Sequence, residues 1–262
     1  MTRATLLIDG DIILYRASVG AAQEVHWGEN DPAFQDLYTI YSDLSVAKQH
    51  VSDTIRSLIS RFDGDVVFCV NDTDNFRKHL TDTYKGGRSR KPLGYWALRE
   101  WVAGEWELRS LPMCEADDTL GILATNGEYA KPVIVSADKD MKTIPARVFR
   151  PHTDEKLMVS EGEANYWHLF QTLTGDTTDG YSGCPGVGPK TAHKLLSAMP
   201  ADPWRIIITQ YIKAGLTEDD ALLQARLARI LRASDWDADN QKVILWSPPA
   251  SIPLEVPKSI QT

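Results

Sequence analysis

The stretch Leu6-Leu7-Ile8-Asp9-Gly10-Asp11 (LLIDGD) decides the fold, because it is a short apolar run that ends in carboxylates. The same pattern recurs as VVFCVND at residues 66–72 and as VIVSADKD at residues 133–140. Apolar runs of this length without alternation are typical of parallel strands that are buried on both faces. Strands are therefore predicted at residues 5–8, 66–70 and 133–137, with a weaker fourth at residues 243–246.

Helical patterns occur between and after these strands. Residues 46–62 place apolar side chains at helical spacing, with Val51, Ile55 and Leu58 on one face. Strands that alternate with helices predict an α/β fold, with a mostly parallel central sheet and helices on both faces. The proline-rich residues 247–259 are expected to be extended. The other predicted helices span residues 94–106, 116–125, 162–173, 189–198 and 218–231.

Length and composition limit the class of protein. The chain has 262 residues, of which 43% are hydrophobic and 24% charged, so disordered and coiled-coil classes are excluded. No window approaches the roughly 18 apolar residues of a membrane span, and early carboxylates leave no room for a secretory segment. The three cysteines lie too far apart for a disulfide framework or a Cys-based zinc site, which favours a reducing cytosol.

Carboxylates gather where ligands bind in such folds. Each strong strand runs directly into acid, and ligands of open α/β sheets bind beyond the carboxyl ends of the strands. Any single acid here could be a turn residue or a helix cap. Several acids in one crevice repel one another unless cations are bound, and oxygen-only ligands suit Mg²⁺ or Mn²⁺. The nine candidate ligands are Asp9, Asp72, Glu115, Asp117, Asp118, Asp138, Asp140, Asp176 and Asp179.

The charge balance changes meaning once these acids are assigned to a metal site. The formal net charge of −8 argues against a nucleic-acid partner, but it becomes +1 without the nine candidate ligands. Residues 77–99 carry seven Lys or Arg and one acid, Asp82, together with Tyr84, Gly86 and Gly87. A solvated face is the ordinary interpretation of such a segment. Cations with an aromatic in a Gly-containing loop also suit phosphate neutralisation and base stacking on single strands.

A second phosphate-binding pattern is GCPGVGPKTAHKLL at residues 183–196. A glycine-rich turn before a helix that opens with Pro189 presents free backbone N–H groups, and Lys190 and Lys194 add positive charge one helical turn apart. A plain turn between two helices is the alternative. The position of the glycine-rich pattern shortly after Asp176 and Asp179 favours the phosphate cradle over a plain turn.

Five collinear blocks resemble the flap endonuclease or 5′-nuclease family. They are LLIDGD, VNDTDNFRKHLTDTYKGGR, CEADD, SADKD and LTGDTTDGYSGCPGVGPKTA, the last resembling an acid pair followed by a helix–hairpin–helix motif. YWHLFQTLTGDTTDGYSG and TEDDALLQARLARIL further resemble the 5′–3′ exonucleases of short-tailed phages. The resemblance implies 5′–3′ exonuclease and flap endonuclease action on duplex ends, nicks and flaps, leaving 5′-phosphate and 3′-hydroxyl. RNA–DNA hybrids are a further candidate substrate, because an enzyme that grips the backbone could accept RNA. The resemblance also implies a role in phage DNA replication and host DNA breakdown in the host-cell cytoplasm.

The resemblance also assigns roles to residues. It implies a nuclease core at residues 1–181, with a basic arch at residues 77–112, and a helix–hairpin–helix region at residues 182–262. One Mg²⁺ (or Mn²⁺) would lie with Asp9, Asp72, Glu115 and Asp117, and the second with Asp118, Asp138, Asp140, Asp176 and Asp179. Lys85 and Arg88 would stabilise phosphate charge, and Tyr84 would stack on a base. DNA contacts are expected from Arg77, Arg90, Lys91, Gly186, Gly188, Lys190, Thr191 and Lys194, with a monovalent cation as a further candidate ligand near Gly186.

Departures and alternatives remain open at this point. Asp11 stands where many family members have a neutral residue, so no ligand role is assigned to it. The short stretch between Arg88 and Cys114 favours an open cleft over a threaded 5′ end. Alternative functions are a flap endonuclease with little exonuclease activity, an aspartyl-phosphate phosphatase built on Asp9 and Asp11, and a non-catalytic DNA-binding module. Residues 19–37 have no assigned role.

Overall fold

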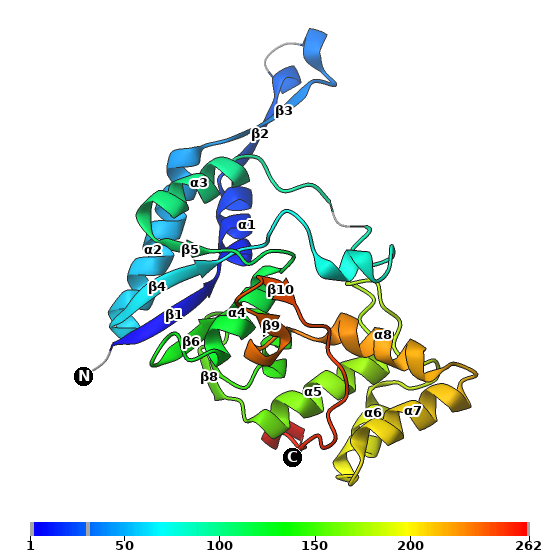
Figure 1. Ribbon diagram of the computed structural model, residues 1–262. Coiled ribbons are helices and arrows are strands. Elements are labelled where there is room, and N and C mark those ends of the chain that lie inside the picture. Colours follow the sequence, from blue (N-terminus) through cyan, green and yellow to red (C-terminus); the bar gives the residue numbers. More distant parts are fainter. Residues whose placement is uncertain (1–2, 30–31, 88, 261–262) are drawn as a thin grey trace.

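The computed structural model describes residues 3–29, 32–87 and 89–260, and its centre is a six-stranded sheet in the order β5-β4-β1-β6-β7-β8. The first five strands in this order are parallel, and β8 is antiparallel to β7. This confirms the predicted α/β fold with a mostly parallel central sheet (Figure 1). The strands are β1 (Ala4–Asp9), β4 (Gly64–Cys69), β5 (Glu107–Arg109), β6 (Pro132–Val135), β7 (Arg147–Arg150) and β8 (Glu155–Met158).

Both faces of the sheet are buried, which explains the unbroken apolar runs of the central strands. Leu6 and Ile8 pack on one face against side chains of α1 (Gly10–Gly20), α2 (Leu44–Phe62) and α3 (Tyr95–Glu105). Leu7 packs on the opposite face against α4 (Ala116–Thr125) and the start of α5 (Glu161–Thr174). Successive side chains of a strand point to opposite faces, so each face takes every second residue of β1.

The C-terminal helices surround a third apolar cluster. The rest of α5 packs with α6 (Pro189–Ser197), α7 (Pro203–Lys213) and α8 (Glu218–Ala228) through side chains such as Leu169, Leu196, Ile207 and Ala225. Because α5 contributes to this cluster and to the sheet, it joins the two parts of the fold (Figure 1). The proline-rich tail lies along α5 in extended form, and Asn165 Nδ2 donates to the Pro253 carbonyl at 3.1 Å.

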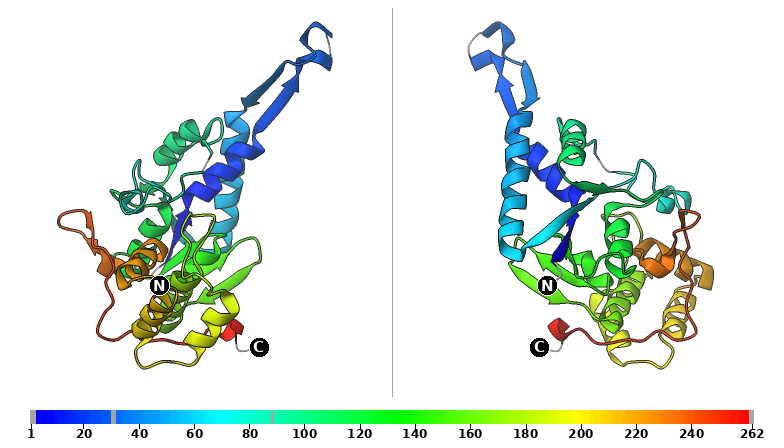
Figure 2. Two further views of the ribbon diagram at one scale, coloured as in Figure 1. Left: turned by 90° about the vertical axis from the view of Figure 1, so that its right-hand side faces the viewer. Right: turned by 60° about the vertical axis from the view of Figure 1, so that its left-hand side comes forward.

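A two-stranded hairpin of β2 (Ala22–His26) and β3 (Tyr38–Ser42) projects well beyond the rest of the molecule (Figure 2). It contains the short 3-10 helices η1 (Trp27–Glu29) and η2 (Pro32–Phe34) near its tip. Its large apolar side chains are about half exposed, including Trp27, Tyr38 and Ile40. The segment without an assigned role is therefore mostly this hairpin.

The structure corrects part of the predicted element list. The fourth strand at residues 243–246 is wrong, because only β10 (Lys242–Val243) pairs, with β9 (Trp236–Asp237), outside the central sheet, and Ile244 is half exposed. The three strong strands and the six predicted helices are present with shifts of up to three residues at their ends. All three cysteines are buried and free. No helix of the described residues is long and apolar enough to cross a membrane. Elements that the sequence patterns missed are α1, α7, β2, β3, β5, β7 and β8.

Candidate active site

The carboxyl ends of β4, β1 and β6 lie side by side at one edge of the sheet, as predicted. Asp9 ends β1 and Asp138 follows β6, while the N-terminus of α4 brings Glu115 and Asp117 to the same edge. One pocket of about 330 Å³ is lined by these four carboxylates, and a second, of about 190 Å³, extends from three of them toward the loop after α5. The structure thus gathers seven of the nine candidate ligands, namely Asp9, Glu115, Asp117, Asp138, Asp140, Asp176 and Asp179.

The electrostatics of these pockets are those of crowded acids. Burial, with the nearby charges of Asp11 and Asp138, raises the pKa of Asp9 to about 6, although hydrogen bonds from Ser136 and Ile12 act in the opposite direction. Burial and the charge of Asp138 raise the pKa of Asp140 to about 7. The pKa of Asp117 is raised well above its usual range by burial and by the charges of Asp9 and Asp138. Shifts with these causes indicate that nearby positive charge does not balance the ionised forms of Asp9, Asp117 and Asp140.

The donor set suits a hard divalent cation. The seven carboxylates offer only oxygen, which matches the preference of Mg²⁺ and Mn²⁺. No donor in the described part of the chain binds the Asp117 carboxylate, so its oxygens are available. The side chains are near one another but not closed into a ligand shell, since no three His, Cys, Asp or Glu of the described residues form a cluster that could hold a metal ion.

Two residues that the sequence interpretation missed orient these acids. Ser136, at the end of β6 and 2% exposed, donates from Oγ to Asp9 Oδ2 at 2.7 Å and accepts from the Asp138 N–H at 3.0 Å. It therefore bridges the acids of two neighbouring strands. Gln171 on α5 donates from Nε2 to Asp140 Oδ1 at 2.6 Å. The only signal for Ser136 in the sequence was its place just before Asp138.

Asp118 and Arg77 are not where the sequence interpretation put them. Arg77 is 2% exposed, and its guanidinium grips Asp118 with two hydrogen bonds of 2.7 and 2.8 Å and reaches Glu115 Oε2 at 3.3 Å. Asp118 is fully buried and also accepts from the backbone N–H of Leu231 and of Glu115. The structure therefore speaks against Asp118 as a metal ligand and Arg77 as a DNA contact, because the two buried side chains neutralise each other, although Arg77 also lines the smaller acidic pocket.

Tyr84 is also buried, although Lys85 next to it remains at the pockets. The ring of Tyr84 is 4% exposed and packs against Tyr181 and Leu227, and its hydroxyl donates to Glu115 Oε2 at 2.7 Å. This burial speaks against stacking of Tyr84 on a base, although Tyr84 also lines the smaller acidic pocket. Lys85 Nζ lies 2.6 Å from Glu115 Oε1 and 3.4 Å from Asp179 Oδ2, and Lys85 lines both acidic pockets.

The backbone around Lys85, in the basic segment, lies close against the loop that carries Asp176 and Asp179. The Lys85 N–H donates to the Asp179 carbonyl at 3.0 Å. Gly180 has a φ of +80°, and a Cβ at this position would lie 2.3 Å from the Thr83 carbonyl oxygen. A residue with a side chain could not occupy this position without moving the segment. Arg88, predicted to stabilise phosphate charge, lies outside the described residues.

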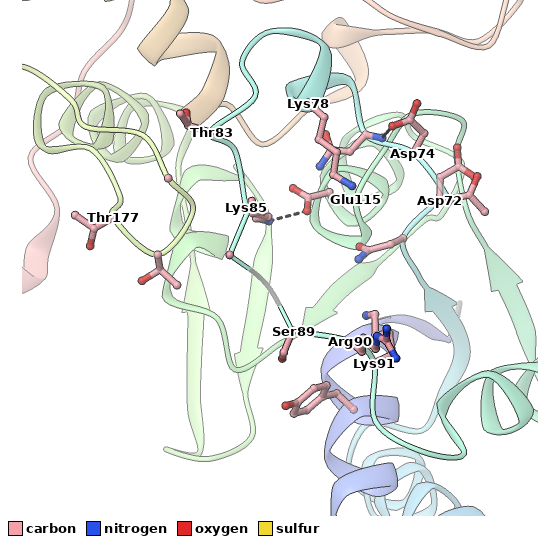
Figure 3. Close-up of a pocket in the computed structure, with 18 residues that line it drawn as sticks. Asp72, Asp74, Lys78, Thr83, Lys85, Ser89, Arg90, Lys91, Glu115 and Thr177 are labelled. Carbon is pink, nitrogen blue, oxygen red and sulfur yellow. Dashed lines mark hydrogen bonds and ion pairs between the residues drawn. The ribbon is translucent and has the colours of Figure 1, made fainter.

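A larger pocket of about 780 Å³ lies beside the acidic ones and is lined by the basic segment (Figure 3). Lys78, Lys85, Arg90 and Lys91 contribute positive charge to it. Asp72 lines this pocket instead of the one with Asp9, and its Oδ2 accepts from the Met113 N–H at 2.8 Å. Asp72 therefore shares a pocket with Glu115 but not with the other six gathered acids, although it lies beyond the same edge of the sheet.

Asp11 and Tyr15, both on α1, are further residues of this region. Asp11 binds Lys91 Nζ at 2.6 Å and accepts from the Tyr95 hydroxyl at 2.6 Å, so it fastens the end of the basic segment to α1. Tyr15 is 45% exposed and lines both the larger pocket and the pocket of Asp9. It is the aromatic side chain common to these two pockets among the described residues.

The glycine-rich turn before α6 is exposed, as a phosphate cradle requires. Gly186 has a φ of +78°, and neither Gly186 nor Gly188 has a neighbour near its Cβ position. Lys190, Thr191 and Lys194 are exposed on α6, which opens at Pro189 as predicted. The turn thus leaves backbone N–H groups and two cations on one accessible surface.

Comparisons with known proteins show which sequences and folds this chain is similar to. The sequence-family model described as "5'-3' exonuclease, N-terminal resolvase-like domain" matches residues 4–163. The exonuclease of Escherichia phage T7 is 32% identical over 94% of each chain. The exodeoxyribonuclease of Enterobacteria phage T3 is 31% identical over 94% of this chain and 93% of its own. The structure of the phage T5 flap endonuclease in a pseudo-enzyme-product complex with DNA and metal ions has a TM-score of 0.62 at 15% identity, covers 86% of this chain and 89% of its own, and so shares the fold.

Proposed function

Since this chain belongs to the 5′–3′ exonuclease family, and is thus a phosphodiester hydrolase, we propose that it degrades duplex DNA from 5′ ends and nicks and cleaves 5′ flaps with divalent cations. The observation that carries the proposal is the gathering of seven carboxylates at the carboxyl ends of parallel strands, where the pKa values of Asp9, Asp117 and Asp140 are raised. The products would be 5′-phosphate and 3′-hydroxyl. RNA in RNA–DNA hybrids is proposed as a further substrate, and phage DNA replication and host DNA breakdown in the host-cell cytoplasm as the setting.

We propose two Mg²⁺ ions, or Mn²⁺, as cofactors. Asp9, Glu115 and Asp117 face the site from β1 and α4, and Asp138, Asp140, Asp176 and Asp179 face it from β6 and the loop after α5. Bound cations would lower the pKa of water and neutralise charge on the phosphate, as two-metal sites do. Asp72 remains a candidate only as a ligand through water, because it lines the adjacent pocket.

The chain's own residues would bind and orient the strand. Lys85, held between Glu115 and Asp179, is near the acidic pockets and would stabilise charge on the scissile phosphate. Tyr15 takes the stacking role that burial denies to Tyr84, because its exposed ring lines two adjoining pockets. Arg90 and Lys91 would neutralise neighbouring phosphates.

The exposed turn at Gly186 and Gly188, with Lys190, Thr191 and Lys194, would hold the duplex backbone at a distance from the cut. A monovalent cation near Gly186 remains part of this proposal. The division into a nuclease core at residues 1–181 and a DNA-binding region at residues 182–262 is likewise part of the proposal.

Asp11 speaks against the phosphatase alternative. An aspartyl-phosphate phosphatase needs its second aspartate free to move a proton, whereas Asp11 is ion-paired with Lys91 and accepts from the Tyr95 hydroxyl. The intact set of gathered acids likewise speaks against a non-catalytic DNA-binding module, because uncompensated carboxylates repel phosphate.

The test is a time course with Mg²⁺ on a 5′-labelled nicked duplex, its flapped counterpart and an RNA–DNA hybrid, resolved on a denaturing gel. Mononucleotides or short oligomers released from the 5′ end of both DNA substrates would support the proposal. A single product at the flap junction, with the nicked duplex slow, would favour a flap endonuclease with little exonuclease activity. The Asp138→Asn variant is the control, and cleavage at the wild-type rate by this variant would contradict the assignment of the acids.

A separate experiment tests the expectation of an open cleft. The flapped substrate is compared with one whose 5′ end carries a bulky blocking group. Cleavage of both would support an open cleft, and complete dependence on a free 5′ end would contradict it.

A further inference from the structure

A second large cavity lies away from the acidic pockets and shares no lining residue with them. It has a volume of about 720 Å³, is open to solvent, and is lined by the C-terminal end of α4, the start of α5, the segment after α8 and the proline-rich tail. Arg229 and Arg232 both line it, and both are buried, at 5% and 6% exposed. We call it the arginine cavity.

Arg232 is a buried cation whose bonding is incomplete. A guanidinium has five N–H donors. In Arg232, Nη1 donates to Asn165 Oδ1 at 2.9 Å and Nη2 donates to the Thr143 carbonyl at 2.8 Å. Its Nε has no partner, and among the described residues no carboxylate lies within ion-pair distance of it. Among the described residues, three of its five N–H donors therefore have no protein acceptor.

Neighbouring carboxylates do not pair with the charge of Arg232. Asp235 is committed to Arg229, since its Oδ2 lies 2.8 Å from both Nε and Nη2 of that residue. Glu161 lines the cavity and acts on Arg232 only as a more distant charge. Burial and the charge of Arg229 lower the pKa of Arg232 to about 9. Buried charges in proteins are normally paired, so this arrangement points to a missing anion.

We propose that the arginine cavity binds a phosphate group, either as inorganic phosphate or as the 5′-phosphate of a mononucleotide. The cavity volume is in the range of small-molecule sites and admits a ligand as large as a mononucleotide. Ser234, Ser247 and Ser251 also line the wall and offer hydroxyl donors to a ligand in the cavity. Phosphate oxygens match the planar fork of arginine, which makes phosphate the favoured anion.

The same segment connects this cavity to the catalytic acids. The carbonyls of Leu227 and Arg229 accept from the Arg77 guanidinium, and the Leu231 N–H donates to Asp118 Oδ1 at 3.0 Å. Arg77 in turn contacts Glu115. An anion that binds in the arginine cavity and orders residues 227–232 would therefore also fix Arg77, which contacts Glu115.

The test compares thermal unfolding in phosphate and in chloride at equal ionic strength, with EDTA present. Binding to the folded state at ten times the dissociation constant should raise the Tm of the wild type by roughly 3–5 °C. Arg232→Gln should lose this increment, whereas Arg205→Gln, at an exposed position on α7, should keep it. An equal response of Arg232→Gln and wild type to phosphate would overturn the proposal, because general salt effects act on both alike.

A second measurement avoids dependence on the folding of Arg232→Gln. Calorimetric titration with inorganic phosphate is carried out on the wild type and on Lys85→Ala, which removes a cation of the other pockets. Equal binding by both supports a site outside those pockets. Absence of binding, or its loss in Lys85→Ala, would contradict it. Titration with deoxyadenosine 5′-monophosphate against deoxyadenosine then decides whether the nucleotide or free phosphate is preferred.

Discussion

Replacing Ser136 by alanine should weaken Mg²⁺ binding about 10- to 100-fold while the fold remains intact. The change removes the 2.7 Å hydrogen bond to Asp9 Oδ2 and the acceptor of the Asp138 N–H. A hydrogen bond to a charged group contributes about 1.5–3 kcal/mol, and about 1.4 kcal/mol corresponds to a tenfold change in affinity. Loss of a partner that orients a metal ligand has effects in the same range in other metal sites.

The assay is calorimetric Mg²⁺ binding without DNA, followed by the Mg²⁺ dependence of cleavage. We expect a higher half-saturating Mg²⁺ concentration, nearly normal turnover at saturating Mg²⁺, and an unchanged KM for DNA. Ser136→Thr keeps the hydroxyl and should retain binding. Ser18→Ala is the matched control, because Ser18 is fully buried and its Oγ has no partner among the described residues. Wild-type Mg²⁺ affinity in Ser136→Ala would refute the idea that Ser136 bridges two ligands.

Three further predictions concern pH, base stacking and duplex binding. The raised pKa values of Asp9 and Asp140, about 6 and 7, mean that without metal the folded state favours the protonated acids. Metal-free stability should therefore fall as pH rises from about 4 to 7, and Mg²⁺ should stabilise more at pH 8 than at pH 5; thermal unfolding that is flat with pH would contradict this. Tyr15→Ala should raise the KM for DNA several-fold while Tyr84→Phe leaves it nearly unchanged, which steady-state kinetics on a nicked duplex can check; equal effects would argue against stacking on Tyr15. Lys190→Ala should weaken DNA binding and reduce its salt dependence, as measured by fluorescence anisotropy, and a turnover defect that excess DNA does not rescue would exclude a binding role.

The sequence predicted the centre of the fold because the central strands combine unbroken apolar runs with acids at their ends. Leu6 and Ile8 face one side of the sheet and Leu7 faces the other. Apolar side chains on both sides are typical of a strand that is covered on both faces. The short outer strands β5, β7 and β8 carry charged side chains and lacked such a signal. The β2–β3 hairpin was missed because both of its faces are largely exposed, so its residues show no alternation.

At the site, residue type was predictable but orientation was not. Asp117 and Asp118 are adjacent in sequence, yet Asp117 lines the acidic pockets and Asp118 is buried against Arg77. The partner that separates their roles lies about 40 residues away in the chain. Likewise, Tyr84 belongs to a segment with the composition of an exposed loop, but Leu227 covers it from far along the sequence.

The bonds from Arg77 to the carbonyls of Leu227 and Arg229 affect the order in which the protein matures on the ribosome. These contacts join residues that are 150 or more positions apart, so the support beneath Glu115 is incomplete until residues 227–229 have been made. Domains fold during synthesis from the N-terminal end, and the sheet can form earlier. A nascent or prematurely terminated chain would then have its acids in place without their anchor. The enzyme would therefore have a fully supported Glu115 only after residues 227–229 had folded onto the nuclease core.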